Sequence, residues 1–381
     1  MARSGSNSPE IHRGLAGIYV DDSAISKVMP ETQSLTYRGY PVQDLAESCC
    51  FEEVAYLLYN GELPTRGQLQ TFRKHERAER ALSPRLKRVI KEFPRRRVHP
   101  MDTIRTAVSF MGLEDPDTAD SSLEANRRKA MRLLAKIPAA VAADYRHRKG
   151  KPFIGPRKDL SFAENFFHMC FGKVPEKEVV KAFDVSLILY AEHTFNASTF
   201  TARTITSSLA DMHGAVTGAI ASLKGPLHGG ANEAVMHNLK EIGSVAKVKP
   251  WVDRKLAAKE IVIGFGHRVY KSGDSRVPTM TKYERRMADV TGQKKWIEIA
   301  DALAEEVTTR TGIHPNLDFP AGPAYYMMGF DIDLFTPIFV VSRITGWCAH
   351  IIEQSGDNRL IRPLSHYTGP DERKMAPLTR R

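Results

Sequence analysis

Two histidines and one aspartate lie in short segments whose other residues are mostly glycine and apolar side chains. His228 follows Gly-Pro-Leu and precedes two glycines, His267 lies in Gly-Phe-Gly-His-Arg-Val-Tyr, and Asp318 lies in Pro-Asn-Leu-Asp-Phe. Histidine titrates near neutral pH, glycine lets a ligand approach the backbone, and a carboxylate beside apolar neighbours can act as a base. The combination indicates acid–base chemistry, in particular the removal of a proton next to a carbonyl group.

The same three residues also have structural explanations. His228 and His267 could satisfy backbone groups of their own loops, although glycine beside histidine in both segments favours the approach of a ligand. Asp318 precedes Phe-Pro and could be a helix N-cap, which is the explanation that its neighbours alone favour. On the residues alone, catalytic and structural roles therefore both stay open.

Other motifs of known chemistry are incomplete or absent. Gly264-Phe-Gly266 resembles the start of a dinucleotide-binding loop, but Val269 stands where the third glycine belongs and no βαβ pattern surrounds it. No Walker A motif occurs, and none of the thirteen histidines has HExxH spacing. We therefore predict no metal site.

The elements that must position these segments are mostly helices. Residues 15–40 alternate apolar and polar side chains, which predicts short strands or a hairpin. A helix is predicted from Phe51 to Gly61, and Ser83-Pro84 supplies a cap and a first-turn proline for the next one. Similar helical patterns begin at Met101, Ser121 and Glu176.

Two long helical regions form the predicted core. Residues 179–223 are rich in Ala, Ser, Thr and Gly and are apolar on several faces, which indicates closely packed interior helices. Residues 334–354 place apolar side chains on a period near 3.6 and return to the same core. The intervening residues 231–328 are more charged and are broken by glycine and proline, which indicates an inserted lobe.

A chain of 381 residues is longer than a single hydrophobic core usually supports. We predict a mostly α-helical, two-domain protein with a small N-terminal β element. Residues 1–228 and 332–381 form the predicted large domain, and residues 229–331 form the small one. The active site is expected in the cleft between them, with the small domain rotating to exclude water.

The composition describes a soluble globular protein with an excess of positive charge. Hydrophobic residues make up 42% of the chain and the formal net charge is +11. A basic chain suggests nucleic-acid binding, but the positive residues lie between apolar helical positions or in the C-terminal tail, without interleaved aromatic residues. We favour an enzyme for polyanionic substrates and keep a basic nucleic-acid-binding helical protein as the remote alternative.

No apolar run approaches the length of a membrane span, and the polar N-terminus lacks the apolar stretch of a signal peptide. The four cysteines have no CxxC spacing, as expected for reduced thiols. We expect a cytoplasmic protein that contacts neither membrane nor nucleic acid.

Several longer motifs occur in one order along the chain, and together they resemble the citrate synthase family from about Gly14 to Pro370. They are Leu35-Thr-Tyr-Arg-Gly-Tyr-Pro-Val-Gln-Asp-Leu, His193-Thr-Phe-Asn-Ala-Ser-Thr-Phe, the segments around His228, His267 and Asp318, and Ile361-Arg-Pro-Leu-Ser-His-Tyr-Thr-Gly-Pro. The resemblance implies a citrate-synthase-like, two-domain helical fold.

It also implies a condensation between an acyl-CoA and oxaloacetate. Asp318 would remove a proton from the carbon alpha to the thioester while His228 donates a hydrogen bond to the thioester oxygen. His267 would donate to the alkoxide that forms as the enol carbon attacks the ketone, and His193 would orient the keto acid. The CoA thioester is then a substrate, and no cofactor is required.

The resemblance further implies that Arg276, Arg343 and Arg362 clamp the carboxylates of oxaloacetate, a task that suits the guanidinium fork. Arg80 would add a loosely matched ligand contact. On the residues alone each arginine would be a surface charge, except that Arg343 lies in an apolar helix and implies an anionic partner. The residues implied for binding CoA are Ile261, Val262, Ile263, Gly264, Phe265 and Lys271.

Within the family, residues 27–46 and Thr345-Gly-Trp-Cys-Ala-His look most like bacterial 2-methylcitrate synthases. This implies propionyl-CoA as the acyl substrate, with acetyl-CoA also used and citrate synthase as the nearest alternative. One methylene is worth only about 1 to 3 kcal/mol in a pocket, so both thioesters are expected to react. Small residues on several faces of residues 179–223 leave a face for a second copy, and the resemblance implies a homodimer in which Arg362 acts in the neighbouring subunit's site.

Overall fold

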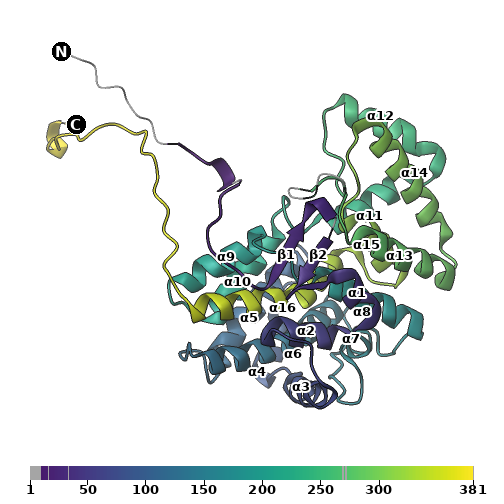
Figure 1. The fold of residues 1–381 in the computed structure, drawn as a ribbon, viewed down its shortest axis with the longest axis horizontal. Coiled ribbons are helices and arrows are strands. Elements are labelled where there is room, and N and C mark those ends of the chain that lie inside the picture. Colours follow the sequence, from purple (N-terminus) through teal and green to yellow (C-terminus); the bar gives the residue numbers. More distant parts are fainter. Residues whose placement is uncertain (1–9, 16, 33, 268–269, 271–272, 381) are drawn as a thin grey trace.

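The computed structural model describes residues 10–380 except 16, 33, 268, 269, 271 and 272, and it is mostly helical (Figure 1). Three short antiparallel strands, in the order β1-β2-β3, form the only sheet among these residues. The strands are β1 (Ser26–Met29), β2 (Ser34–Tyr37) and β3 (Tyr40–Pro41). The predicted mostly-α fold with a small N-terminal β element is confirmed.

The helices of the main body pack around α16, which passes through its centre (Figure 1). These helices are α1 (Val42–Ser48), α2 (Phe51–Asn60), α3 (Arg66–Glu79), α4 (Pro84–Glu92), α5 (Pro100–Glu114), α6 (Leu123–Arg148), α7 (Phe162–Phe171), α8 (Lys177–Tyr190), α9 (Ala197–Ser207), α10 (Met212–Lys224) and α16 (Phe335–Gly356).

A second group of helices stands to one side of this body, at the upper right of Figure 1. They are α11 (Ala231–Ile242), α12 (Val248–Ala257), α13 (Val277–Thr291), α14 (Lys294–Thr311) and α15 (Asp318–Met327). Helix α13 packs on α8 of the body and α11 contacts α16, whereas α12 and α14 lie farthest from the body. The predicted division at residues 229–331, and its rotation, stay predictions.

Local signals set several helix boundaries. The Ser83 hydroxyl accepts from the Leu86 amide ahead of Pro84, as the sequence predicted, and α2 ends at Gly61, whose φ of 94° suits glycine. Asp318 is the first residue of α15, and Leu317 occupies the N-cap position. The N-cap explanation of Asp318 is therefore wrong, and its carboxylate is available for another role.

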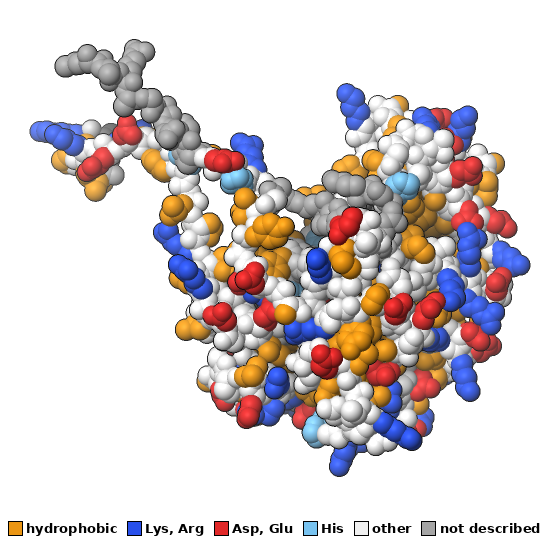
Figure 2. Space-filling model, in the orientation of Figure 1, with side chains coloured by type: hydrophobic (Ala, Val, Ile, Leu, Met, Phe, Trp, Pro, Cys, Tyr) orange, Lys and Arg blue, Asp and Glu red, His pale blue; other side chains and the backbone are white. Residues whose placement is uncertain are grey.

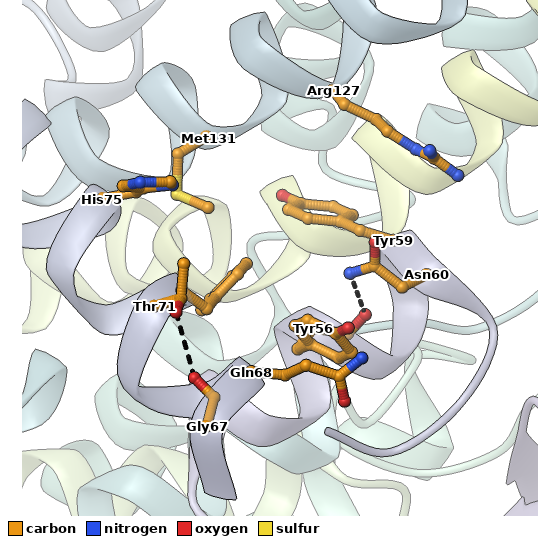
Figure 3. A pocket seen from close by; sticks show the side chains of 10 residues that line it. Tyr56, Tyr59, Asn60, Gly67, Gln68, Thr71, His75, Arg127 and Met131 are labelled. Atoms are coloured by element: carbon orange, nitrogen blue, oxygen red, sulfur yellow. Dashed lines mark hydrogen bonds between the residues drawn. The ribbon is translucent and has the colours of Figure 1, made fainter. Parts of the chain in front are cut away.

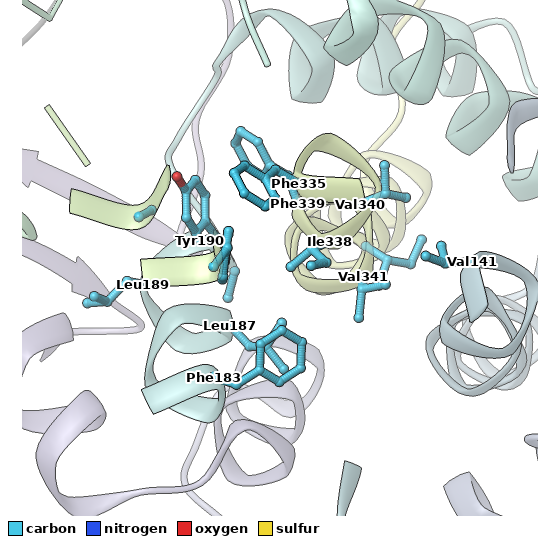
Figure 4. Close-up of a cluster of buried hydrophobic side chains, with 14 of the residues drawn as sticks. Val141, Phe183, Leu187, Leu189, Tyr190, Phe335, Ile338, Phe339, Val340 and Val341 are labelled. Carbon is cyan, nitrogen blue, oxygen red and sulfur yellow. The ribbon is translucent and has the colours of Figure 1, made fainter. Parts of the chain in front are cut away.

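Helix α16 is mostly apolar and is buried on nearly all of its faces. Figure 4 shows Phe335, Ile338 and Phe339 of α16 beside Leu187 and Tyr190 of α8. The helical stretch Ile332–Gly356 is long and apolar enough to cross a membrane, with a mean hydropathy of 1.3, so the expectation that no stretch approaches a span was wrong. The apolar window is completely buried inside the molecule, as in the core helix of a globular protein.

Both chain ends are anchored by one buried arginine on α9. Arg203 donates to Asp21 of the N-terminal segment and to Glu353 of α16, at 2.8 Å each, and its guanidinium lies 4.5 Å from the ring centroid of Phe195. The Ala24 amide donates to the same Glu353 carboxylate. The N-terminal segment and the start of the C-terminal tail therefore leave the body side by side (Figure 1).

The tightest helix contact relevant to the site lies at Gly346 of α16. Its amide donates to the Ala191 carbonyl (3.1 Å), and a Cβ at this position would lie 2.2 Å from Glu192 Oε2 and 2.5 Å from the Ala191 oxygen. Only glycine leaves room for the chain that follows α8. The position of His193 therefore depends on the absence of a Cβ at position 346 of α16.

We expect Gly346→Ala to destabilise the protein by about 1 to 3 kcal/mol, because overpacking exceeds the gain in helix propensity. At Gly67 of α3, a Cβ would have no atom within 4 Å, so Gly67→Ala is the matched control and should be neutral or slightly stabilising. Urea unfolding measures both. Equal stability of Gly346→Ala and wild type would show that the two helices can separate at this contact without cost.

Candidate active site

The first site residue lies where the chain turns away from α8. The Tyr37 hydroxyl of β2 lies 3.0 Å from the Glu192 carbonyl oxygen and accepts from the Glu192 amide, and Thr194 adopts a φ of 50°. His193 is thereby held in the interior, where its Nε2 has no hydrogen-bond partner among the described residues. Burial, followed by Arg276, lowers the pKa of His193 well below its usual value, so the ring is neutral.

His228 lies in the loop between α10 and α11 and faces the start of α9. The Ser198 backbone amide donates to His228 Nε2 (3.2 Å). Because a backbone N–H can only donate, Nε2 is the acceptor and the proton resides on Nδ1. Burial, with a smaller effect of Arg343, lowers the pKa of His228 to about 4. At neutral pH this residue is an uncharged hydrogen-bond donor.

His267 has the opposite tautomer. Its Nδ1 accepts from the Tyr270 amide (3.2 Å), which leaves the proton on Nε2. Its ring centroid lies 4.9 Å from that of His193. Burial, followed by Arg276, lowers the pKa of His267 to about 4, so it is also neutral. The structure therefore brings His193 and His267 into ring contact although 74 positions separate them in the sequence.

Asp318 meets Tyr190, the last residue of α8. The Tyr190 hydroxyl donates to Asp318 Oδ1 at 2.6 Å. Burial raises the pKa of Asp318 to about 6, while the Tyr190 hydrogen bond and Arg276 act in the opposite direction. A carboxylate with a pKa near 6 is still mostly ionised at neutral pH and is a stronger base than an exposed one.

Two buried arginines give the site its positive charge. Arg276 is paired bidentately with Asp274, through Nε (2.9 Å) and Nη2 (2.7 Å). Arg343 donates from Nε to the Tyr190 carbonyl at 2.6 Å and lies 4.7 Å from the Phe339 ring centroid. No acceptor among the described residues is bonded to the terminal nitrogens of Arg343. These nitrogens suit a ligand carboxylate, whereas the fork of Arg276 is already used by Asp274.

The buried carboxylate of Glu192 balances the positive charge of Arg343. Glu192 Oε1 is bonded to the Ser26 hydroxyl and to His350 Nε2, at 2.9 Å each, and Glu192 is completely buried. Burial alone would raise the pKa of Glu192, but His350, Arg343 and Ser26 together hold it below its usual value. The carboxylate stays ionised and supports the positive charge of Arg343.

The segment implied for CoA runs beside the base. Gly264 accepts from the Asn316 amide (2.9 Å), and Phe265 and Pro315 form an isolated antiparallel bridge. The ring of Phe265 lies 4.8 Å from that of Phe319, next to Asp318. Ile261 at the start of the segment is 75% exposed, and Val262 is buried. The backbone of residues 264–266 is thus fixed directly against the residues that precede Asp318.

Two implied residues lie outside this cluster. Arg80 is buried, and it donates to Glu76 (2.8 Å) and to the carbonyls of Arg157 (2.7 Å) and Leu160 (3.0 Å), none of which belongs to the cluster. Arg362 is exposed on the C-terminal tail, and no contact joins it to the cluster of its own chain. Lys271 lies outside the described residues.

The structure also adds residues that the sequence analysis did not single out. Tyr190 bonds the base, Asp274 pairs with Arg276, and Glu192 lies behind Arg343. Asp274 and Glu192 directly neighbour site motifs in the sequence, so a search for buried acids beside them would have found both. No local signal marks Tyr190.

Figure 3 shows a separate cavity of about 370 Å³ between α2, α3 and α6. Aromatic rings of Tyr56 and Tyr59 and the side chains of His75 and Arg127 line it. None of the predicted site residues contributes to this cavity. Among the described residues, no group of three or more His, Cys, Asp or Glu side chains is arranged to hold a metal ion.

The chain is similar to known proteins over nearly its whole length. A sequence model for the citrate synthase C-terminal domain matches residues 14–364. A 2-methylcitrate synthase of Mycobacterium tuberculosis is 58% identical, covering 96% of this chain and 93% of that protein. A citrate synthase of Mycolicibacterium smegmatis is 55% identical, with 97% and 98% covered. 2-Methylcitrate synthase 2 of Corynebacterium glutamicum is 50% identical, with 99% and 100% covered.

Solved structures of citrate synthases are also similar to this chain over nearly its whole length. Citrate synthase from Thermoplasma acidophilum, in a ternary complex with carboxymethyl coenzyme A and oxaloacetate, superimposes with a TM-score of 0.92 at 32% identity, covering 98% of this chain and all of that one. Citrate synthase from Pyrobaculum aerophilum gives a TM-score of 0.90 at 35% identity, with 100% and 99% covered. The motifs, the fold and these similarities lead to one conclusion: the chain belongs to the citrate synthase family.

Proposed function

We propose that this enzyme condenses propionyl-CoA with oxaloacetate and hydrolyses the product to 2-methylcitrate and CoA, and that it also accepts acetyl-CoA. The observation that carries the proposal is the meeting of one carboxylate base, Asp318, with neutral histidine donors and a buried, partly unpaired Arg343. The relatives named 2-methylcitrate synthase, at 58% and 50% identity, support the acyl preference. The 55% identical relative named citrate synthase supports the alternative.

The first step is enolisation of the thioester. Asp318 takes the proton from the alpha carbon, and the Nδ1–H of His228 donates to the thioester oxygen as negative charge develops there. A carboxylate is a weak base for such a carbon, so stabilisation of the oxygen supplies much of the barrier reduction, about 3 kcal/mol for one well-placed donor. Because His228 is neutral, it stabilises the enolate by hydrogen bonding rather than by prior protonation.

The second step forms the carbon–carbon bond. The enol carbon attacks the ketone carbon of oxaloacetate, and the Nε2–H of His267 donates to the new alkoxide. Arg343 binds a carboxylate of oxaloacetate, and the unpaired Nε2 of the buried His193 is positioned to hydrogen-bond the keto acid. Water then cleaves the thioester of the condensed product, which releases the CoA thiol and the tricarboxylate.

The proposal includes a cytoplasmic homodimer. The tail from residue 357 extends away from the body, and its apolar side chains are exposed along it, as the left edge of Figure 2 shows. They include Leu364 (89% exposed) and Met375 (86% exposed). A monomer gains nothing from this exposure, whereas a second copy would bury it. The same tail carries Arg362, which we propose completes the oxaloacetate site of the neighbouring subunit.

The acyl preference is tested by kcat/KM. We expect wild type to favour propionyl-CoA over acetyl-CoA, by a factor within the range of about 10 to 200 that one methylene allows. Asp318→Asn should lose both activities and the wash-in of deuterium at the alpha carbon, because an amide cannot accept the proton. A clear preference for acetyl-CoA would favour the citrate synthase alternative, and retained wash-in would assign the base to another residue.

The pH profile of kcat tests the pairing of Tyr190 with Asp318. The base must be ionised, so activity should rise with pH through about 6. Tyr190→Phe removes a hydrogen bond that lowers the pKa of Asp318, so this limb should move to higher pH by about one unit. Tyr326→Phe, on the same helix α15 as the base, is the control and should leave the limb in place. If the pH dependence of kcat is unchanged in Tyr190→Phe, Tyr190 does not influence the pKa of the catalytic base.

Subunit mixing tests the shared site. Arg362→Ala and Asp318→Asn homodimers should each be nearly inactive, and a mixed dimer should regain activity because one of its two sites then contains both groups. Arg359→Ala, in the same exposed tail, is the control and should stay active alone. Light scattering that finds a fully active monomer, or mixing without recovery, would contradict a site built from two chains.

A further inference from the structure

Two oppositely charged side chains at the candidate active site lie close together but are not paired. Arg343 of α16 and Glu192, in the turn after α8, are both almost completely buried. Burial lowers the pKa of Arg343 to about 10, and among the neighbouring charges Glu192 opposes this most strongly. Within the described part of the chain, no hydrogen bond or ion pair joins the two side chains.

Each of these two side chains has bonding capacity left. Glu192 Oε2 is buried and has no hydrogen-bond partner among the described residues. The bond from Arg343 to the Tyr190 carbonyl uses Nε and leaves the terminal nitrogens. An unsatisfied buried carboxylate oxygen is costly, and a guanidinium fork is a strong partner for it. Arg276 shows what such a pair looks like, because Asp274 occupies its fork bidentately. Glu192 and Arg343 would pair in the same way if nothing held them apart.

Two donors from different elements hold the other oxygen of Glu192. The Ser26 hydroxyl of β1 and the Nε2 atom of His350 on α16 each lie 2.9 Å from Glu192 Oε1. Ser26 is itself fixed, because its oxygen also accepts from the Thr194 amide at 3.0 Å. The carboxylate is therefore restrained at Oε1 by bonds that do not involve Arg343.

Arg203 sets the tautomer in which His350 acts as a donor. Arg203 Nη1 lies 3.3 Å from His350 Nδ1. A guanidinium only donates, so Nδ1 is the acceptor and the proton of the neutral ring resides on Nε2, facing Glu192. His350 is completely buried, and its ring packs edge-on against Phe195 with the centroids 5.5 Å apart. A turned ring would lose both bonds.

We propose that His350 is a positioning residue that holds the Glu192 carboxylate away from Arg343. Ser26 assists it, and the guanidinium thereby stays open to a carboxylate of oxaloacetate. The role of His350 rests on the proposed function, in which Arg343 binds that carboxylate. Without His350, Glu192 would turn onto Arg343 and compete with the substrate.

Asparagine and glutamine at position 350 separate the two bonds of the histidine. The amide of His350→Asn reaches Arg203 but not Glu192, because the asparagine side chain ends where Nδ1 lies. The longer amide of His350→Gln places its nitrogen near the position of Nε2 and still donates to Glu192. His350→Asn should raise the KM and the Kd for oxaloacetate by about tenfold, and His350→Gln by less than about threefold. The kcat and the KM for propionyl-CoA should change little, since saturating oxaloacetate displaces Glu192 from Arg343.

Removing the charge of Glu192 distinguishes competition from structural damage. In the double variant His350→Asn/Glu192→Gln, the neutral amide cannot form an ion pair with Arg343, so the Kd for oxaloacetate should return to within about threefold of wild type. Structural damage from His350→Asn would not be repaired by a second buried change. His147→Asn alters a buried histidine of α6 outside the site, and as the matched control it should change the Kd by less than about twofold.

Isothermal titration of the enzyme with oxaloacetate measures each Kd. A wild type that binds no oxaloacetate would remove the proposed function, whereas normal wild-type binding with an unchanged Kd in His350→Asn would overturn the role of His350 alone. A loss of affinity that Glu192→Gln does not reverse would also overturn it. If His350→Asn does not fold, Ser26→Ala is measured alone and with Glu192→Gln, and the same loss and recovery are expected.

Discussion

The active site depends on the direct contact between the end of α8 and the glycine face of α16. Ala191 and Glu192 lie on Gly346 with no side chain between them, and this closeness brings the Tyr190 carbonyl to Arg343 and the Glu192 carboxylate to His350. The contact places an ionised acid and a guanidinium in the core, each of which would be costly there alone. His193, the next residue, is carried into the cluster by the same turn.

Burial determines which protonation states the cluster can use. It keeps three histidines uncharged, and the nearby arginines act in the same direction. Backbone amides select the tautomers: Ser198 leaves the proton of His228 on Nδ1, and Tyr270 leaves that of His267 on Nε2. The same burial makes Asp318 more basic. Hydrogen-bond donors without charge, next to a strengthened carboxylate, are what proton removal from a weak carbon acid requires.

Sequence patterns predicted the elements and the chemistry better than the partners. Cap signals such as Ser83-Pro84 and Gly61 act locally, and so they could be recognised from neighbouring residues. Glycine beside His228 and His267 marked them for the same reason. The bond from Tyr190 to Asp318 spans 128 positions, and it arises only once α8 and α15 pack together. Whether an arginine is open to a ligand is likewise a matter of packing: Arg276 is taken by Asp274 two residues away, whereas Arg343 keeps terminal nitrogens without a described acceptor.

Arg203 couples the local unfolding of the N-terminal segment to that of the C-terminal tail. One guanidinium bonds Asp21 of the N-terminal segment and Glu353 at the base of the tail, so neither end can detach without leaving part of a buried charge unpaired. Local opening of one end therefore lowers the cost of opening the other. Proteolytic cleavage near Asp21 should therefore increase local opening at residues 357–361, where bonds from Asn358 and Ile361 to Ser207 attach the tail to α9.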